Sequence, residues 1–230
     1  LSLHDALPIY LFADAVKALL TDHCTPAVVR AIEAGQAHAP LWQALEASGF
    51  ADALVPESAG GAGLALADVY PVLELCGSFA VPVPLGETLL ARGLLALAGV
   101  SVPKGSVVFG TGQLASDGRL HCAQVRCGTQ ADWVLVSCGG VCRLLPVAAA
   151  SSGSSSSRAI GPTTMARTSL AGMPRVPLPW LSPRAADEAL PLAQALVAHA
   201  EAQRLLVRAA QRVDFRRKVS QGITASIKVY

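Results

Sequence analysis

Apolar residues recur every three or four positions along residues 14–98, which is the period of an amphipathic helix. Between residues 14 and 34 this pattern predicts two helices. Val16 and Leu20 mark one face of the first, and Thr25 followed by Pro26 is typical of the start of the second. Three further helices are predicted, and a glycine directly follows each of them (41–48 with Gly49, 64–76 with Gly77, 85–98 with Gly99).

The pattern changes near Val102, where short runs rich in valine and leucine replace the helical spacing. Glycine and Asp-Gly turns separate these runs, as in an antiparallel barrel or meander (106–110, 120–125, 133–136, 141–147). Residues 148–157 are serine-rich and are predicted to form a surface loop. Prolines make residues 170–181 extended or irregular, and helical spacing returns from Pro183 to about Phe215.

These elements predict an α+β chain with three parts. An all-helical domain occupies residues 12–102, a mostly antiparallel β-domain occupies 103–182, and 183–230 begin a C-terminal helical bundle. Residues 1–11 look foreign to the rest of the chain, and we exclude them from the fold as a non-native leader. We expect the bundle to be incomplete at Tyr230.

Composition narrows the class of protein. Of the 230 residues, 52% are hydrophobic and 15% are charged, which is typical of a globular protein. A net charge of +2 favours no nucleic-acid partner. The mean hydropathy of +0.46 is high, yet no stretch has the roughly 20 uncharged apolar residues of a membrane span. We therefore expect the apolar excess to mark buried helix faces and a subunit interface, in a homo- or hetero-oligomer.

The cysteines raise the question of a metal site. Four of the six lie between Cys122 and Cys142, but no pair has the Cys-x-x-Cys spacing of a zinc ligand pair. Zinc stays the minor alternative, and buried thiols in a reducing cytoplasm are the preferred interpretation. We predict no metal ligands.

The segment from Trp42 to Thr88 carries the most specific pattern. In order, it contains Trp42, Leu45, Gly49-Phe50, Val55-Pro56-Glu57, Gly60-Gly61-x-Gly63, Asp68, Glu74, Gly77 and Pro82-x-Pro84. This order resembles the N-terminal α-domain of acyl-CoA dehydrogenases. The change from helices to strands near Val102 also resembles the boundary between the first two domains of that family.

The resemblance implies a reaction and its partners. In the family, FAD lies between the β-domain and the C-terminal bundle, and a glutamate removes the α-proton of an acyl-CoA while the flavin takes the β-hydride. A member of this family would be an oxidoreductase of fatty acid or steroid catabolism. It would pass electrons to an electron-transfer flavoprotein or a similar acceptor.

The resemblance also implies cofactor contacts. Arg212-Val-Asp-Phe215 is similar to the family's Arg-x-x-Phe-Gly motif, whose arginine contacts the FAD pyrophosphate of a neighbouring subunit. Gln221 is the candidate for the flavin-contacting glutamine, and Thr111 could offer a hydroxyl to the flavin. The alternative for Arg212 is a solvated cation in the last turn of a helix.

The catalytic base is expected beyond Tyr230, where most family members place it. A minority place it at the start of the bundle, where Glu188 is the available glutamate. The favoured interpretation of Glu188 is a solvent-facing residue in a first helical turn.

The β-domain departs from the family. Its Thr-Glu-Pro-x-x-Gly-Ser-Asp and Gly-x-Lys-x-Trp-Ile segments, which bind flavin, are missing. Three hypotheses therefore stay open: a divergent dehydrogenase that is inactive as this chain alone, a non-catalytic partner subunit of a hetero-oligomeric dehydrogenase, or a fragment without a function of its own.

Overall fold

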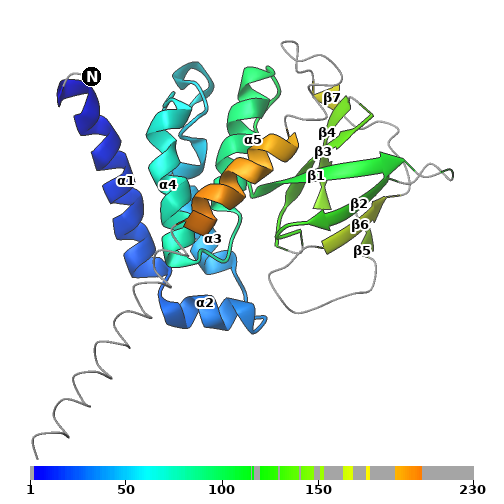
Figure 1. Cartoon of the computed structure of the whole chain (residues 1–230), viewed down its shortest axis with the longest axis horizontal. Helices are drawn as coiled ribbons and strands as arrows, with labels where there is room; N and C mark the ends of the chain where they lie inside the picture. Colours follow the sequence, from blue (N-terminus) through cyan, green and yellow to red (C-terminus); the bar gives the residue numbers. More distant parts are fainter. Residues whose placement is uncertain are drawn as a thin grey trace, which may run out of the picture.

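The computed structural model describes residues 3–114, 116, 120–128, 130–139, 141–147, 151–152, 163–167, 175–176 and 190–203. Helices occupy one side of the molecule and a β-sheet the other (Figure 1). The helix at 190–203, drawn in orange, lies between them and runs across α5. This arrangement confirms the predicted α+β fold, in which a helical domain precedes a sheet and a further helix follows it.

The helices and short 3-10 turns follow the predicted order. They are α1 (Leu3–His23), α2 (Pro26–Glu33), α3 (Ala39–Ala47), η1 (Phe50–Asp52), η2 (Glu57–Ala59), α4 (Leu66–Phe79) and α5 (Leu85–Leu97). The side chain of Thr25 caps α2 by accepting a hydrogen bond from the Val28 amide, as predicted. Gly49, directly after Ser48 at the end of α3, has a φ of +74°, which a glycine adopts without strain.

The predicted end of α4 at Gly77 is wrong. The helix continues to Phe79, and Ala80 adopts the left-handed conformation with a φ of 49°. Gly77 lies inside the helix. A larger side chain at this position would collide with the backbone of Glu201 on helix 190–203. The glycine therefore marks a close approach of two helices and not a helix end.

The sheet has the strand order β5-β6-β2-β1-β3-β4-β7. The strands are β1 (Val107–Leu114), β2 (Leu120–Val125), β3 (Trp133–Cys138), β4 (Val141–Pro146), β5 (Ser151–Ser152), β6 (Thr163–Arg167) and β7 (Arg175–Val176). Among these described strands, β1 and β3 are parallel and the other neighbours are antiparallel. The parallel pair arises because β2 returns along one side of β1 and β3 then lies on its other side.

The two edge strands of the sheet, β5 and β7, lie in segments for which the sequence predicted no regular strand. Strand β5 lies inside the predicted surface loop 148–157, so two residues of that segment pair with β6 instead. Strand β7 lies inside the extended segment 170–181. Residues 190–203 are helical, within the helix predicted from 183 to about 215, and the remainder of that range lies outside the described residues. The domain boundaries, including the leader over 1–11, stay predictions.

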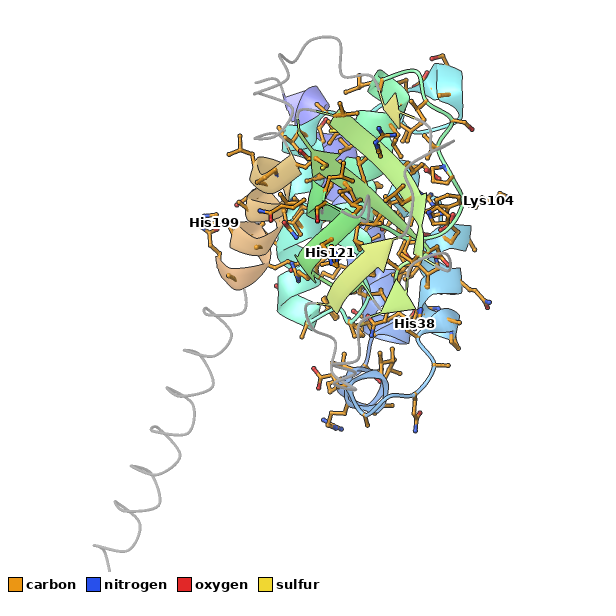
Figure 2. All side chains as sticks on the ribbon, turned by 90° about the vertical axis from the view of Figure 1, so that its right-hand side faces the viewer. His38, Lys104, His121 and His199 are labelled. Carbon is orange, nitrogen blue, oxygen red and sulfur yellow. The ribbon has the colours of Figure 1, made fainter. Side chains whose placement is uncertain are left out.

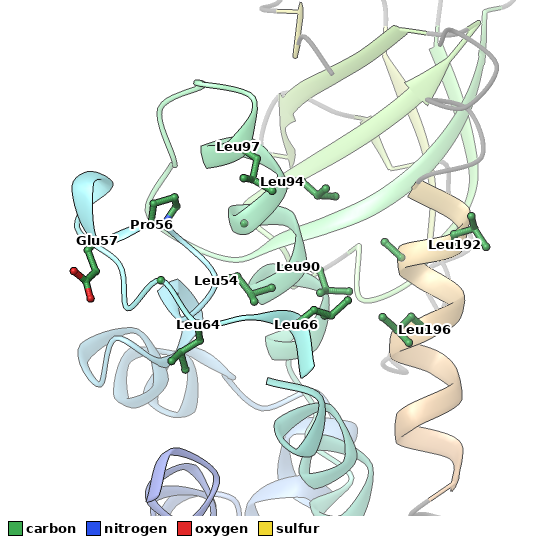
Figure 3. Close-up of a pocket in the computed structure, with 13 residues that line it drawn as sticks. Leu54, Pro56, Glu57, Leu64, Leu66, Leu90, Leu94, Leu97, Leu192 and Leu196 are labelled. Atoms are coloured by element: carbon green, nitrogen blue, oxygen red, sulfur yellow. The ribbon is translucent and has the colours of Figure 1, made fainter. Parts of the chain in front are cut away.

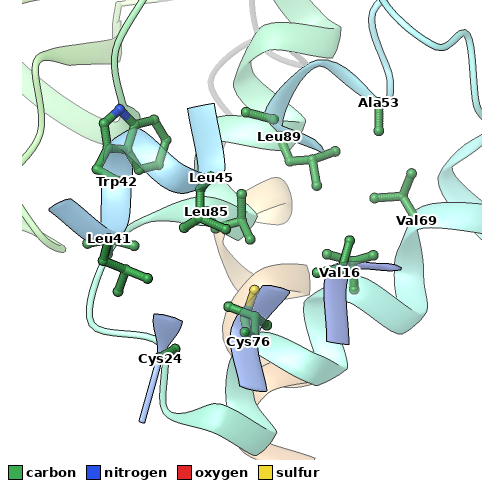
Figure 4. Packing of buried hydrophobic residues seen from close by; sticks show 14 of the residues in the cluster. Val16, Cys24, Leu41, Trp42, Leu45, Ala53, Val69, Cys76, Leu85 and Leu89 are labelled. Atoms are coloured by element: carbon green, nitrogen blue, oxygen red, sulfur yellow. The ribbon is translucent and has the colours of Figure 1, made fainter. Parts of the chain in front are cut away.

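Three apolar clusters form the core. The first lies among α1 to α5 and includes Trp42, Leu45 and Cys76 (Figure 4). The second joins α5 and helix 190–203 to the sheet through Val107, Phe109 and other buried residues. The third lies on the opposite face of the sheet. Helix 190–203 thus belongs to the same core as the sheet and α5.

Helix α5 also carries a buried cation that ties three segments together. Arg92 is 2% exposed and donates hydrogen bonds to Glu46 Oε1 at 2.6 Å and Asp52 Oδ1 at 2.9 Å. It also donates to the carbonyl oxygen of Gly105 at 2.8 Å, directly before the sheet begins. One guanidinium therefore links α3, η1 and the connection into the β-domain to α5.

Within the described residues, no helix combines the length and the apolar character that a membrane span requires.

We predict that Arg92→Ala lowers the free energy of unfolding by about 3 kcal/mol, because it leaves two carboxylates and a carbonyl without their partner. Urea unfolding followed by circular dichroism measures the change. Arg30→Ala, at an exposed position of α2, is the matched control and is expected to have little effect. Equal unfolding midpoints for both variants would contradict the central role of Arg92.

Candidate functional site

An apolar cavity lies where α5, the loop before α4 and helix 190–203 meet (Figure 3). Its volume is about 650 Å³. Three segments line it: the loop (Leu54, Pro56, Glu57, Gly63, Leu64, with Leu66 at the start of α4), α5 (Leu90, Gly93, Leu94, Leu97) and helix 190–203 (Leu192, Ala193, Leu196). The cavity is therefore built between parts of the chain that are far apart in sequence.

Local structure explains how α5 forms one wall. Leu90, Gly93, Leu94 and Leu97 are spaced three and four apart, so they share one face of the helix. Gly93 has no room for a larger side chain, since a Cβ there would lie 2.8 Å from the Cβ of Leu54. The loop consequently packs directly against α5 at this point, and both segments line the cavity.

The lining is almost wholly apolar. Leu97 and Leu192 are 62% and 67% exposed, and Leu66 is 46% exposed, so the cavity opens to an apolar rim. Glu57 is the one ionisable side chain among the described lining residues, and it is itself exposed. Such a cavity suits an apolar group and offers no desolvated acid or base.

Charged groups instead gather beneath the other side of helix 190–203. Arg126, in the turn after β2, forms an ion pair with Glu201. Glu87 on α5 is 2% exposed, and its Oε2 accepts a hydrogen bond of 2.9 Å from the Phe109 amide. Its second oxygen, Oε1, is buried without a hydrogen-bond partner.

Burial dominates the electrostatics of this group. Burial raises the pKa of Glu87 to about 7, although the Phe109 amide and the charge of Arg126 act in the opposite direction. Burial likewise raises the pKa of Glu201, opposed by Arg126. Burial also raises the pKa of Cys127 to about 12 and that of Cys76 still further. Neither thiol is therefore a reactive thiolate at neutral pH.

The structure places only one of the predicted site residues. Thr111 is exposed on β1 and shares a strand face with Val107 and Phe109, which pack toward helix 190–203. Arg212, Phe215, Gln221 and Glu188 lie outside the described residues. The structure therefore does not test whether these five come together.

The sheet face that carries Thr111 is compatible with a polar cofactor. Gln113 and His121 are also exposed there, at paired positions of β1 and β2. His121 is labelled in Figure 2. By contrast, Gly112 faces the packed third core cluster, where an added Cβ would lie 2.6 Å from Leu120 Cδ1. The exposed hydroxyl and amide groups offer hydrogen-bond partners to a polar cofactor on this face, whereas Gly112 forms no cradle for one.

Histidine and cysteine side chains are dispersed. His199 projects from the outer side of helix 190–203, and its Nε2 lies 2.9 Å from Gln203 Nε2 (Figure 2). Five of the six cysteines are buried, and Cys138 is partly exposed. In the described part of the chain, no three His, Cys, Asp or Glu side chains converge as metal ligands would.

The Glu87–Arg126–Glu201 group was not predicted from the sequence. One signal was available, because Glu87 and Arg92 interrupt a helix whose other residues are mostly apolar. A charge within such a run is either solvated on an edge or buried with a partner. The partners, however, are 39 and 114 positions from Glu87, at Arg126 and Glu201, and no local pattern connects them.

Comparison with known proteins identifies the helical domain. Residues 10–99 match the family model described as acyl-CoA dehydrogenase, N-terminal domain. Two curated relatives, each called acyl-CoA dehydrogenase IpdE2, come from Mycolicibacterium smegmatis and Mycobacterium tuberculosis. They are 42% and 40% identical over 96 and 92 residues, which are 40% and 38% of this chain. The aligned segments span 31% and 29% of those relatives.

Solved structures extend the likeness to the whole fold. The ChsE4-ChsE5 complex from Mycobacterium tuberculosis is similar with a TM-score of 0.66 and 18% identity, over 89% of this chain and 65% of that one. A variant of the Tcur3481-Tcur3483 steroid ACAD gives a TM-score of 0.58 and 24% identity, over 85% and 61%. These matches confirm the resemblance predicted from the sequence.

We predict that Gly77→Ala displaces helix 190–203 and lowers the free energy of unfolding by about 1–3 kcal/mol, because two helix backbones meet at this position. The measurement is the urea midpoint of the whole chain. Ala80→Gly is the control: it adds no atoms at the end of the same helix and relieves a φ of 49°, so it should be neutral or slightly stabilising. A midpoint for Gly77→Ala equal to that of the unchanged chain would refute the close packing.

Proposed function

We propose that this chain, whose residues 10–99 match the N-terminal domain of acyl-CoA dehydrogenases, is part of a flavin-dependent dehydrogenase that oxidises the Cα–Cβ bond of an acyl-CoA thioester. In this proposal the protein works in the cytoplasm, within a homo- or hetero-oligomer. It passes electrons to an electron-transfer flavoprotein or a similar acceptor.

The apolar cavity carries the proposal. Its leucine walls and its volume of about 650 Å³ suit a hydrocarbon group held away from water. Its open rim leaves room for the polar part of a thioester ligand to reach solvent. We therefore assign the cavity to the acyl group, with α5 and helix 190–203 as its two main walls.

The proposed cofactor contacts come from the β-domain and from the C-terminal bundle. FAD supplies the hydride acceptor when bound. Thr111 offers its exposed hydroxyl on the sheet face. Arg212, Phe215 and Gln221 are proposed to hold the rest of the cofactor from the bundle, with Arg212 on the pyrophosphate of a neighbouring subunit. The base that removes the α-proton is proposed to follow Tyr230, and Glu188 is the second candidate.

A specific observation favours a second candidate function, the non-catalytic partner subunit. The β-domain lacks both segments with which members of the family bind flavin. One solved structure with a similar fold is a complex of two differently named chains, ChsE4 and ChsE5. In this alternative the chain completes the site of a catalytic partner. FAD uptake by the native protein separates the two: a protein purified colourless and unable to take up FAD favours the partner subunit.

We predict that Ala193→Trp weakens acyl-CoA binding by more than about tenfold while leaving CoA binding unchanged, because the indole fills the cavity. Titration calorimetry with a long-chain acyl-CoA and with CoA alone measures both affinities. Leu114→Phe is the control, since Leu114 is an exposed apolar residue of β1 outside the cavity. Unchanged acyl-CoA affinity in Ala193→Trp would contradict the assignment of the acyl group to this cavity.

We also predict that Arg212→Ala in the native protein weakens FAD retention by about one to two orders of magnitude, the effect of losing a charge-assisted contact worth roughly 1.5–3 kcal/mol. Flavin fluorescence titration measures the affinity. Arg208→Ala, one turn earlier and outside the Arg-x-x-Phe motif, is the control. Equal affinity in all three proteins would return Arg212 to the role of a solvated cation.

A further inference from the structure

Three ionisable side chains from distant parts of the chain meet beneath helix 190–203. Glu87 comes from α5, Arg126 from the turn after β2, and Glu201 from the helix itself. The proposed reaction uses none of them. Glu201 forms an ion pair with Arg126, whose charge also acts on Glu87. With one guanidinium for two carboxylates, the group carries an excess negative charge when both carboxylates are ionised.

The surroundings make that excess charge costly. Glu87 is 2% exposed, and its Oε1 has no hydrogen-bond partner. An ionised carboxylate in this position has lost its water and is only partly compensated by the Phe109 amide. The neutral form avoids this cost, so the closed arrangement favours a proton on the group.

Helix 190–203 packs closely against α4 and α5 beside this group, next to the pocket that Arg126 and Glu201 line. A Cβ at Gly86, directly before Glu87, would lie 3.0 Å from Val197 Cγ1 and 3.6 Å from Glu201 Oε1. A side chain at Gly77 would collide with the backbone of Glu201. The helix therefore approaches α4 and α5 closely at these two glycines and covers Glu87, so displacing it would admit water to this carboxylate.

We propose that Glu87, Arg126 and Glu201 form a proton-linked latch that holds helix 190–203 closed over α4 and α5. The latch is tight when Glu87 holds a proton and Glu201 is ionised beside Arg126, and it loosens when both carboxylates are ionised. The Arg126–Glu201 ion pair connects the helix to the sheet in the closed form.

The direction of the pH effect follows from linkage. The pKa of Glu87 is about 7 in the closed form, and burial raises that of Glu201 as well. When the helix lifts, water returns both groups toward the ordinary range of a glutamate. The closed form then binds more protons than the open form between about pH 4.5 and pH 7. Closure is therefore strongest at the acidic end of this window, weakens as the pH rises through it, and levels off above it.

Other ionisable groups around Glu87 do not reverse this direction. Cys76 on α4 and Cys127 beside Arg126 stay neutral, because burial raises the pKa of both thiols. Glu33 on α2 lines the pocket at this junction but is exposed. Arg92, on α5 as well, is engaged by Glu46 and Asp52.

The latch acts on the wall of the apolar cavity. Three residues of helix 190–203 line this cavity, namely Leu192, Ala193 and Leu196. A looser latch would therefore widen the cavity or open it. Only this consequence rests on the proposed acyl-binding function. The latch itself concerns the folded chain and is tested without any ligand.

Hydrogen–deuterium exchange of the 230-residue chain, read from peptides covering 190–203 and corrected for the intrinsic effect of pH, tests the latch. We expect protection of these amides to fall by roughly tenfold between pH 5.5 and pH 8 in the unchanged chain. Glu87→Gln keeps an acceptor for the Phe109 amide but does not titrate, so most of this pH dependence should vanish. Glu33→Gln, a neighbouring exposed carboxylate, should behave as the unchanged chain.

Labelling of Cys76 gives an independent test in the unchanged chain, should Glu87→Gln not fold. Cys76 lies beneath the helix, and Cys138 in β3 is the internal reference. With an aromatic disulfide reagent, we expect the ratio of Cys76 to Cys138 labelling to rise with pH between 5.5 and 8. A flat ratio, or a Glu87→Gln chain whose helix protection changes with pH as much as that of the unchanged chain, would overturn the proposal.

Discussion

The buried polar side of helix α5 is the feature on which the arrangement of the two domains depends. The hydroxyl of Thr88 accepts a hydrogen bond from the Val107 amide at 3.0 Å and donates one to the Val107 carbonyl oxygen at 3.1 Å. Glu87 accepts from Phe109, and Arg92 binds the connection before β1. Because buried polar groups are costly without partners, these contacts fix how the first strand docks on the helix.

The opposite side of the same helix builds the candidate site. Gly93 brings the loop at Leu54 against α5, and Leu94 and Leu97 face the cavity. Helix 190–203 supplies the other wall and shares a core cluster with α5 and the sheet. The position of the cavity therefore follows from the docking of strand and helix, and the charged group under helix 190–203 makes its outer wall sensitive to protonation in our proposal.

Features with a local cause could be predicted from the sequence. The cap at Thr25, the course of α5 and the limits of β2 each follow from neighbouring residues. Non-local contacts could not be predicted. The continuation of α4 through Gly77 depends on a helix more than a hundred residues later, and the parallel pairing of β1 with β3 depends on where β2 lies. Of the site residues that the family pattern predicts, Thr111 lies in the described part of the chain and its role stays a prediction, whereas the buried carboxylate of Glu87 was recognised only in the fold.

Photo-crosslinking tests the central claim, that α5 and helix 190–203 enclose an acyl group. An acyl-CoA with a diazirine in its hydrocarbon chain would be irradiated with the native protein, and the labelled peptides would be identified by mass spectrometry. The account predicts labels on the cavity walls, around Leu94 and Ala193, that excess unlabelled acyl-CoA suppresses and free CoA does not. Labels confined to other surfaces, or to a partner subunit alone, would contradict it.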